Sequence, residues 1–417
     1  MKPTRRSFLK GTAGVLLAGA GCATTKPAPA RLAAAAAPKP RRSIGPNDRI
    51  RCGFVGIGGR GSSILGSALT FDDIDMVAVA DTYDANREKA LAACKEKYAD
   101  AKGYVRFEDL LEKEQLDAVI TATPDHIHLP VIMAALDCGL DVYTEKPMTL
   151  SWEDAKAVRE RTRGTGAVLQ VGTQLRSMPM YGRLREVVRS GEMGKLLRVW
   201  VNRDGKAKPL SVADTPAGAT AENTHWPLFL RDTKRYDYDP LRYFRWRQFV
   251  EYSNGYFGDL MLHHLDICHF VTGCGMPSVV KAVGGIYTLH DGRTTPDTVS
   301  ALIEYPEDFQ FNYSTTVGNG HFGLNERYLF TDGTVEVRGM GAMSIFRGDE
   351  EEKVPSAGIK NEPHLADFFE AMRSRGETVA PVEAGLMGAA CADMAVMSMD
   401  AGQAVKWDRE KMAAKVV

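Results

Sequence analysis

A histidine flanked by carboxylates is the clearest chemical signal in the sequence. Asp259, His263 and Asp266 stand at positions i, i+4 and i+7, so on a regular helix they share one face of an otherwise apolar segment. A buried polar stripe is costly unless its groups are used or satisfied. Because a histidine held by a carboxylate suits acid–base chemistry near neutral pH, we predict that His263 exchanges protons with a substrate. The neighbouring His264 is either a second site residue or a buried helix contact.

A lysine at the end of a predicted strand is the second candidate for catalysis. Glu145-Lys146-Pro147 follows the strand expected over residues 141–144. Ligands of parallel α/β sheets bind at the carboxyl edge of the strands, which is where these residues belong. Removal from water lowers the pKa of an amine, so Lys146 can serve in proton transfer at that edge. Taken alone, the tripeptide fits a surface lysine before a proline turn equally well.

A glycine-rich run after the first predicted strand matches the pattern of dinucleotide-binding loops: Gly56, Ile57, Gly58, Gly59, Arg60 and Gly61. Such glycines let the backbone approach a pyrophosphate at a helix N-terminus. Asp81 follows twenty residues after the last glycine, at the end of the second predicted strand. A carboxylate there accepts hydrogen bonds from the ribose and repels a 2′-phosphate, so NAD is predicted over NADP. Arg60 keeps NADP open as a minor option.

A further polar run, Thr123-Pro124-Asp125-His126-Ile127-His128, follows the strand predicted at 116–121. It belongs to the same ligand-binding edge of the sheet. The spacing of His126 and His128 resembles a metal pair, but no third or fourth ligand lies nearby in sequence, so we expect no metal. Thr123, Pro124 and the two histidines are instead predicted to flank the nicotinamide or to cap the helix.

Alternating strands and helices are predicted to position these residues. Crossover connections between such elements require a parallel, doubly wound sheet, which we assign to a Rossmann domain over residues 49–172. The strands are expected at 51–55, 74–80, 116–121, 141–144 and 167–171, and the helices from the glycine loop to Thr70 and at 84–98, 126–138 and 152–163.

Residues 173–417 are predicted to form an α+β domain. Longer strands of alternating polarity indicate an open, mostly antiparallel sheet with one covered face. They are expected at 196–201, 279–287, 298–305, 309–317 and 328–337. Helices at 259–271, 363–373 and 382–400 are expected to cover that face.

The first 48 residues are predicted to be a targeting segment and linker. Residues 4–10 (TRRSFLK) form a twin-arginine motif before the short apolar stretch 11–20, which predicts export to the periplasm. Cys22 resembles a lipoprotein cysteine but lacks the usual preceding leucine, so a lipid anchor stays open. The Ala/Pro-rich residues 23–46 are interpreted as a tether or propeptide. We expect no other segment to cross a membrane.

The composition excludes some partners. A formal net charge of -1 gives no reason to expect nucleic acid. The seven cysteines are scattered without a Cys-x-x-Cys pair, so neither a zinc site nor a disulfide framework is indicated.

In combination, these motifs resemble the glucose–fructose oxidoreductase / myo-inositol dehydrogenase (Gfo/Idh/MocA) family over roughly residues 49–405. The resemblance implies a Rossmann domain, an open antiparallel sheet and action on a hydroxyl carbon of a sugar or cyclitol. It also implies that Lys146 polarises or deprotonates the hydroxyl, that His263 is the acid/base, and that Asp259 binds substrate or orients the histidine. Gln174 and Arg176 become candidate substrate or cofactor contacts by the same resemblance.

The chain departs from the family pattern in an aromatic and arginine-rich insert at residues 205–249. Its side chains are predicted either to stack on sugar rings, Trp246 foremost, or to pack on the domain or a neighbouring subunit. They are Trp226, Tyr236, Tyr238, Tyr243 and Trp246, beside Arg242 and Arg245.

Export sets a condition on the chemistry, because free nicotinamide cofactor is scarce outside the cytoplasm. We therefore expect NAD to be held tightly and restored within each cycle. An oxidoreductase with a second substrate satisfies this, and the combination of Lys146 and His263 favours it. A redox-neutral glycosidase, with transient oxidation at carbon 3 and elimination, is the alternative. A non-catalytic NAD- and sugar-binding protein is a third reading. A homo-oligomer is expected, since open sheets commonly bury their exposed face.

Overall fold

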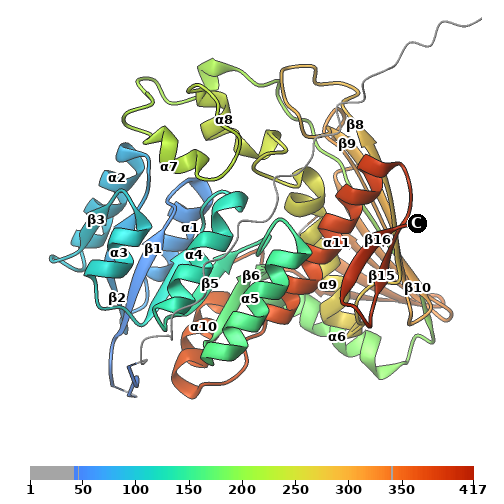
Figure 1. The fold of residues 1–417 in the computed structure, drawn as a ribbon. Coiled ribbons are helices and arrows are strands. Elements are labelled where there is room, and N and C mark those ends of the chain that lie inside the picture. The colour runs from blue at the N-terminus through green and yellow to red at the C-terminus, as the bar shows by residue number, and fades with distance from the viewer. Residues whose placement is uncertain (1–41, 46, 340) are drawn as a thin grey trace, which may run out of the picture.

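The computed structural model of the chain describes residues 42–45, 47–339 and 341–417. The predicted export motif, Cys22 and most of the predicted linker lie outside these residues. The described part holds two sheets, a parallel one and a mostly antiparallel one, with helices packed between and around them (Figure 1).

The N-terminal sheet confirms the predicted doubly wound fold. Its six parallel strands have the order β3-β2-β1-β4-β5-β6 and comprise β1 (Ile50–Val55), β2 (Ile74–Ala80), β3 (Lys102–Tyr104), β4 (Ala118–Thr121), β5 (Asp141–Glu145) and β6 (Leu169–Gly172). Its helices are α1 (Gly59–Ala68), α2 (Asp84–Lys95), α3 (Phe107–Lys113), α4 (Asp125–Asp137) and α5 (Trp152–Thr165). The short elements β3 and α3 are additions to the predicted series. The order of strand addition reverses at β1, because β2 and β3 lie on one side of it and β4 to β6 on the other, and such a switch point opens a crevice at the carboxyl ends of β1 and β4.

The second sheet has ten strands in the order β14-β13-β12-β11-β7-β10-β9-β8-β15-β16, all antiparallel neighbours except β7 and β10. The strands are β7 (Leu196–Arg203), β8 (Val279–Gly285), β9 (Thr298–Tyr305), β10 (Phe309–Thr316), β11 (Leu324–Phe330), β12 (Thr334–Arg338), β13 (Ala342–Arg347), β14 (Glu350–Pro355), β15 (Val405–Asp408) and β16 (Ala413–Val416). The single strand predicted at 328–337 is wrong, because the chain turns at residues 331–333 and forms the β11–β12 hairpin.

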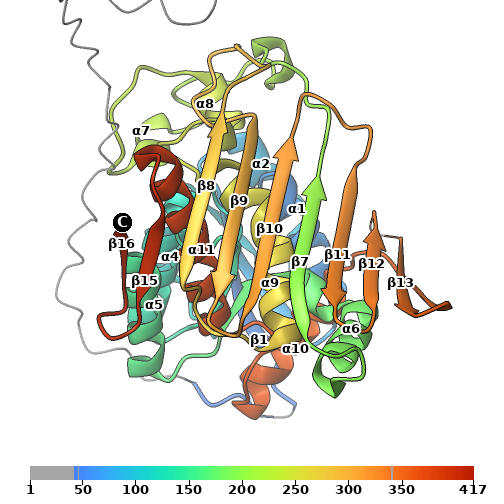
Figure 2. The ribbon, with the colours of Figure 1, turned by 90° about the vertical axis from the view of Figure 1, so that its right-hand side faces the viewer.

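In the part of the chain that the structure describes, helices cover one face of this sheet, as predicted. They are α6 (Pro179–Ser190), α9 (Leu262–Thr272) and α11 (Val382–Ala401), and the other face is bare in Figure 2. The bare face carries exposed apolar side chains, among them Trp200, Val283 and Leu302.

Two of the C-terminal helices differ from expectation. Helix α10 (Glu362–Ser374) covers the parallel sheet instead of the antiparallel one, since Leu365, Phe368 and Phe369 share a core with Ile50 and Phe54. Helix α11 is long and apolar enough to span a membrane, contrary to the expectation that no such segment exists after the N-terminus. Because 72% of its most apolar window is buried inside the protein, its composition is that of a core helix.

The insert folds as a small lobe above the parallel sheet (Figure 1). It contains α7 (Trp226–Leu230) and α8 (Pro240–Phe244). Its aromatic side chains build a separate core that also takes in Tyr83 of the N-terminal domain. Most of the aromatic residues of the insert therefore pack on the N-terminal domain, which is one of the two roles predicted for them.

Candidate active site

The loop after β1 has the backbone that a pyrophosphate site needs. Gly56 has a φ of 84°, and a Cβ at this position would lie 2.7 Å from the backbone of Thr123. A Cβ on Gly61 would collide with the carbonyl oxygen of Gly56. By contrast, Cβ atoms on Gly58 and Gly59 would meet no atom within 4 Å. The first and last glycines are therefore required by the turn, and the middle pair faces open space that fits a diphosphate.

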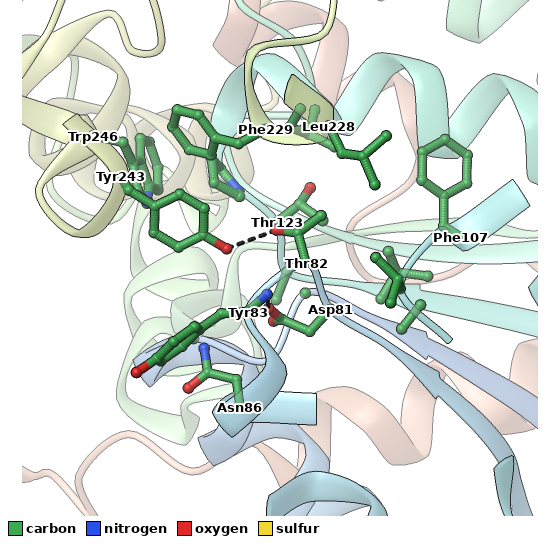
Figure 3. A pocket seen from close by; sticks show the side chains of 18 of the residues that line it. Asp81, Thr82, Tyr83, Asn86, Phe107, Thr123, Leu228, Phe229, Tyr243 and Trp246 are labelled. Carbon is green, nitrogen blue, oxygen red and sulfur yellow. Dashed lines mark hydrogen bonds between the residues drawn. The ribbon is translucent and has the colours of Figure 1, made fainter. Parts of the chain in front are cut away.

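A cavity of about 310 Å³ lies at the carboxyl ends of the parallel strands (Figure 3). The loops after β1, β2, β3 and β4 form its floor and walls, and Asp81, Asn86 and Phe107 are among its lining residues. The insert closes it from above with Leu228, Phe229, Tyr243, Phe244 and Trp246. This cavity lies where the sequence predicts the dinucleotide.

Asp81 lies in the cavity wall and is held by backbone groups. Its carboxylate accepts the N–H of Ile57 and, at 2.7 Å, the N–H of Tyr83. Burial raises the pKa of Asp81 to about 6, although both N–H groups and the nearby Arg87 oppose the rise. The carboxylate is thus fixed in place and ionised at neutral pH.

Arg60, Glu145 and Gln174 form one polar network beside the glycine loop. Arg60 Nε donates to Glu145 Oε1 at 3.0 Å, and Gln174 Nε2 donates to the same oxygen at 2.6 Å. A second Arg60 nitrogen donates to Asn361 at 2.9 Å. The salt bridge with Glu145 offsets the positive charge that would attract a 2′-phosphate.

The structure brings Lys146, Asp259 and His263 together from the two domains. Lys146 Nζ donates to the Asp259 carboxylate at 2.9 Å and to its carbonyl oxygen at 2.6 Å. Lys146 is only 9% exposed. Burial alone would raise the pKa of Asp259, but the charges of Lys146 and Arg247 outweigh it and lower the pKa below its usual range. The predicted lysine therefore meets a permanently ionised carboxylate.

His263 is neutral at neutral pH. Burial lowers its pKa well below the usual value, and the charge of Lys146 lowers it further. Its Nδ1 is buried and has no hydrogen-bond partner among the described residues. A neutral imidazole has one unprotonated ring nitrogen, which can accept a proton.

Asp266 lies on α9 three residues after His263, but within the described part of the chain it is not hydrogen-bonded to His263, Lys146 or Asp259. Residues Phe257–Met261 form one π-helical turn before α9, and that wider turn shifts Asp259 from the regular α-helical spacing to His263 and Asp266. Asp266 instead accepts two hydrogen bonds from Arg176, both 2.8 Å long. Arg176 also donates to the carbonyl of Val379, which places this candidate contact in a buried ion pair.

His264 is a buried contact, the second of its two predicted roles. It is fully buried, with Nδ1 3.2 Å from Glu326 and Nε2 3.2 Å from an Arg203 nitrogen. Because Nε2 must accept from the guanidinium, Nδ1 carries the hydrogen and donates it to Glu326. Glu326 also accepts the hydroxyl groups of Tyr328 and Tyr181.

The two histidines after β4 hold loops in place. His126 Nε2 donates to the carbonyl of Phe229 at 2.8 Å, which ties the insert to α4. His128 lies between the carbonyls of Thr123 and Pro147, at 2.9 and 2.7 Å. Burial lowers the pKa of both imidazoles. No group of three or more potential ligands in the described ranges is arranged to hold a metal ion.

Two arginines near the site were missed by sequence reasoning. Arg247 Nε lies 3.5 Å from Asp259, and its guanidinium lies over the ring of Trp246 at 4.1 Å. Trp246, predicted to bind substrate, lines the cofactor cavity beside it. Arg203 at the end of β7 contacts His264, the neighbour of His263. The arginine-rich composition of the insert pointed to Arg247, whereas no sequence signal marked Arg203.

Comparisons with family models match both domains. Residues 50–173 match the GFO_IDH_MocA model, described as an oxidoreductase family with an NAD-binding Rossmann fold. Residues 230–407 match the C-terminal alpha/beta domain of the same family.

The chain spans about half or less of the length of the curated relatives it matches. The chain is 28% identical to scyllo-inositol 2-dehydrogenase (NAD(+)) of Bacillus subtilis over 41% of this chain and 40% of that protein. It is 33% identical to inositol 2-dehydrogenase of Corynebacterium glutamicum over 36% and 43%. It is also 29% identical to a glycosyl hydrolase family 109 protein of Shewanella baltica, over 46% and 44%.

Solved structures agree over almost the whole described fold. The WlbA dehydrogenase of Bordetella pertussis, in complex with NADH and UDP-GlcNAcA, is similar with a TM-score of 0.68 and 20% identity. The similarity covers 86% of this chain and 99% of that chain. Together, the glycine loop, the parallel and antiparallel sheets and the two matching models show that the chain belongs to the Gfo/Idh/MocA oxidoreductase family, with an NAD-binding Rossmann domain at its N-terminal end.

Proposed function

We propose that this protein catalyses NAD-dependent hydride transfer at a hydroxyl-bearing carbon of a sugar or polyol. The observation that carries the proposal is the meeting of Lys146, from the cofactor domain, with Asp259 and His263, from the second domain. The similarity to inositol dehydrogenases supports the substrate class.

Each of the three side chains has a role that its surroundings support. The glycine loop and Asp81 would hold NAD in the cavity, where the cofactor would supply a hydride acceptor for the carbon being oxidised. Lys146 donates a hydrogen bond to the substrate oxygen and moves away from Asp259 to do so. His263, kept neutral by burial, accepts the hydroxyl proton. Asp259 remains ionised and balances the charge of Lys146 and of the protonated imidazole.

A redox-neutral glycosidase is the second candidate function. The similarity to a glycosyl hydrolase family 109 protein favours it. The same three side chains would serve a transient oxidation of the sugar, for which a retained NAD would supply a reversible hydride acceptor. No external acceptor is then needed.

We further propose that the protein is exported by the twin-arginine route to the periplasm, where it recycles a tightly held NAD. A lipid attached to Cys22 would anchor it to the membrane there. The motif at residues 4–10 supports export, and the insert above the cavity supports retention of the cofactor.

We also propose that the protein forms a homo-oligomer through the bare face of the antiparallel sheet, because Trp200 and Val283 are exposed on that face. Native mass spectrometry checks the assembly, and cell fractionation checks the location.

One experiment separates the functions. Purified protein is mixed with sugars, polyols and glycosides, the near-ultraviolet absorbance of reduced nicotinamide is recorded, and products are analysed. A ketone or lactone product supports the oxidoreductase, whereas a cleaved glycoside without net reduction supports the glycosidase. A spectrum unchanged by every compound, with no product, indicates a binding protein instead.

Matched variants test the assignment. Lys146→Ala and His263→Ala are expected to lose turnover while NAD stays bound, because neither side chain forms the glycine loop. Lys353→Ala and His321→Ala, at exposed positions, serve as controls. Near-full activity in Lys146→Ala or His263→Ala would contradict the proposed roles.

A further inference from the structure

Among residues 42–45, 47–339 and 341–417, no carboxylate forms an ion pair with the Arg203 guanidinium. Arg203 is half-buried at the end of β7. Its side chain makes one hydrogen bond within the described part of the chain, from Nη1 to Nε2 of His264 at 3.2 Å. A guanidinium has five N–H donors, so most of this group's capacity is unused. Partly buried charges are normally paired, which makes the arrangement informative.

The single contact of Arg203 is rigidly supported from behind. His264 is fixed by Glu326, and Glu326 is fixed by the hydroxyl groups of Tyr181 and Tyr328. All four supporting side chains are fully buried. The chain of hydrogen bonds therefore holds the guanidinium in one orientation while leaving its other donors available.

The position of Arg203 is close to the proposed reaction centre. His264, its contact, directly follows His263 in the chain. Arg203 and Lys146 both act electrostatically on the His263 imidazole, where burial is the largest influence and lowers the pKa. Arg203 thus approaches from the antiparallel sheet while Lys146 approaches from the parallel one.

The charges around the centre leave Arg203 without direct compensation. Asp259 is shared by Lys146 and Arg247, at 2.9 and 3.5 Å. Asp125 lies close enough to both cations to feel their charge, but burial raises its pKa to about 7 and its hydrogen bond comes from Ser253. Glu326 lies behind His264 and is separated from Arg203 by that ring.

We propose that Arg203 binds a carboxylate carried by the substrate, which makes the substrate an acidic sugar such as a uronate. The planar fork of a guanidinium matches a carboxylate with two parallel hydrogen bonds. This inference rests on the proposed function for the location of the substrate. It adds to that function the charge of the substrate and the residue that recognises it.

The test is calorimetric titration of the NAD-loaded full chain with matched pairs of neutral and acidic sugars. The pairs are glucose and glucuronate, galactose and galacturonate, and mannose and mannuronate, with glucose 6-phosphate as a separate anion. At least one uronate is expected to bind about 10- to 100-fold more tightly than its neutral partner, because charge-assisted hydrogen bonds are among the strongest in proteins.

Variants of one strand assign the effect to Arg203. Arg203→Met should reduce the advantage of the uronate to within about twofold, and Arg203→Lys should retain part of it, since an ammonium keeps the charge without the fork. Arg198→Met, at an exposed position of the same strand, should leave the advantage unchanged. Thermal unfolding and bound NAD are measured for each variant to confirm that it is folded.

Several results would overturn the proposal. They are equal affinity for neutral and acidic sugars, an advantage that survives in Arg203→Met, binding of glucose 6-phosphate alone, and no binding of any uronate. A uronate that binds through Arg203 but never reduces NAD would instead refute the proposed function and leave this inference standing.

Discussion

Replacing Asp266 with leucine is the sharpest test of the difference between the predicted and observed sites. The carboxylate was predicted to share the catalytic face, but it forms a two-bond ion pair with Arg176. The side chains of Asp266 and Arg176 are 2% and 9% exposed. We therefore expect Asp266→Leu to lower stability and to leave the chemistry of the folded protein intact.

The magnitude follows from burial. Removing one partner of a buried pair leaves an uncompensated charge and typically costs about 3–5 kcal/mol. For a cooperative unit the size of the second domain, about 2 °C of Tm is lost per kcal/mol, so the expected decrease is roughly 6–10 °C. The double variant Arg176→Met/Asp266→Leu should recover most of this loss, because an apolar pair of similar volume often substitutes for buried charges.

The assay combines thermal unfolding with measurements of activity and of bound NAD. Activity and bound NAD are measured well below the unfolding temperatures of the wild type and the variant. Glu383→Leu is the matched control, since its ion pair with Arg163 is exposed and should be worth less than about 1 kcal/mol. A stable Asp266→Leu protein without turnover would refute the reasoning and return Asp266 to the active site. A double variant as unstable as the single one would refute the ion-pair explanation.

Three further predictions concern the cofactor cavity. Gly61→Val should abolish NAD binding in a protein that still folds, because its Cβ collides with the loop backbone, and bound NAD measured by absorbance checks this. NAD affinity should fall as pH decreases through about 6, where the Asp81 carboxylate takes up a proton and loses an acceptor, and Asp81→Asn should remove that dependence in titrations across pH. Tyr243→Phe loses the 2.6 Å hydrogen bond to Thr82 and should release NAD several-fold faster in a trapping experiment, whereas Tyr287→Phe, at an exposed position, should not. Unchanged release from Tyr243→Phe would show that the insert does not retain the cofactor.

The fold of the N-terminal domain could be predicted because its signals are local. Alternating apolar strands and helices, with a glycine loop after the first strand, specify a parallel sheet and its ligand edge. The three-residue strand β3 was missed since Lys102–Tyr104 is too short and too exposed to give an apolar period. The turn Thr331-Asp332-Gly333 is recognisable from its residues, but alternating polarity continues on both sides of it, so one strand was predicted over 328–337 where the structure has two.

The site was predictable where it depended on strand ends and not where it depended on helix geometry. The positions of Lys146 and Asp81 follow from the sheet, and the meeting of Lys146 with His263 was implied by resemblance to the family. The ion pair of Asp266 was not foreseen, because its partner Arg176 stands 90 residues earlier in the chain. The placement of Arg203 depends on a strand from the second sheet that no local pattern connects to His263.

Helix α10 has a consequence for how the polypeptide acquires its structure. Its side chains Phe368 and Phe369 fill the core beneath the first strands of the parallel sheet, and Glu362 accepts a hydrogen bond from Ser67. A ribosome releases the nucleotide-binding half long before this helix emerges, so the nascent half displays an unfinished apolar surface until translation nears its end. A fragment that ends at residue 172 would retain that exposed apolar surface and tend to aggregate. Fusing residues 362–374 to the fragment would cover that surface.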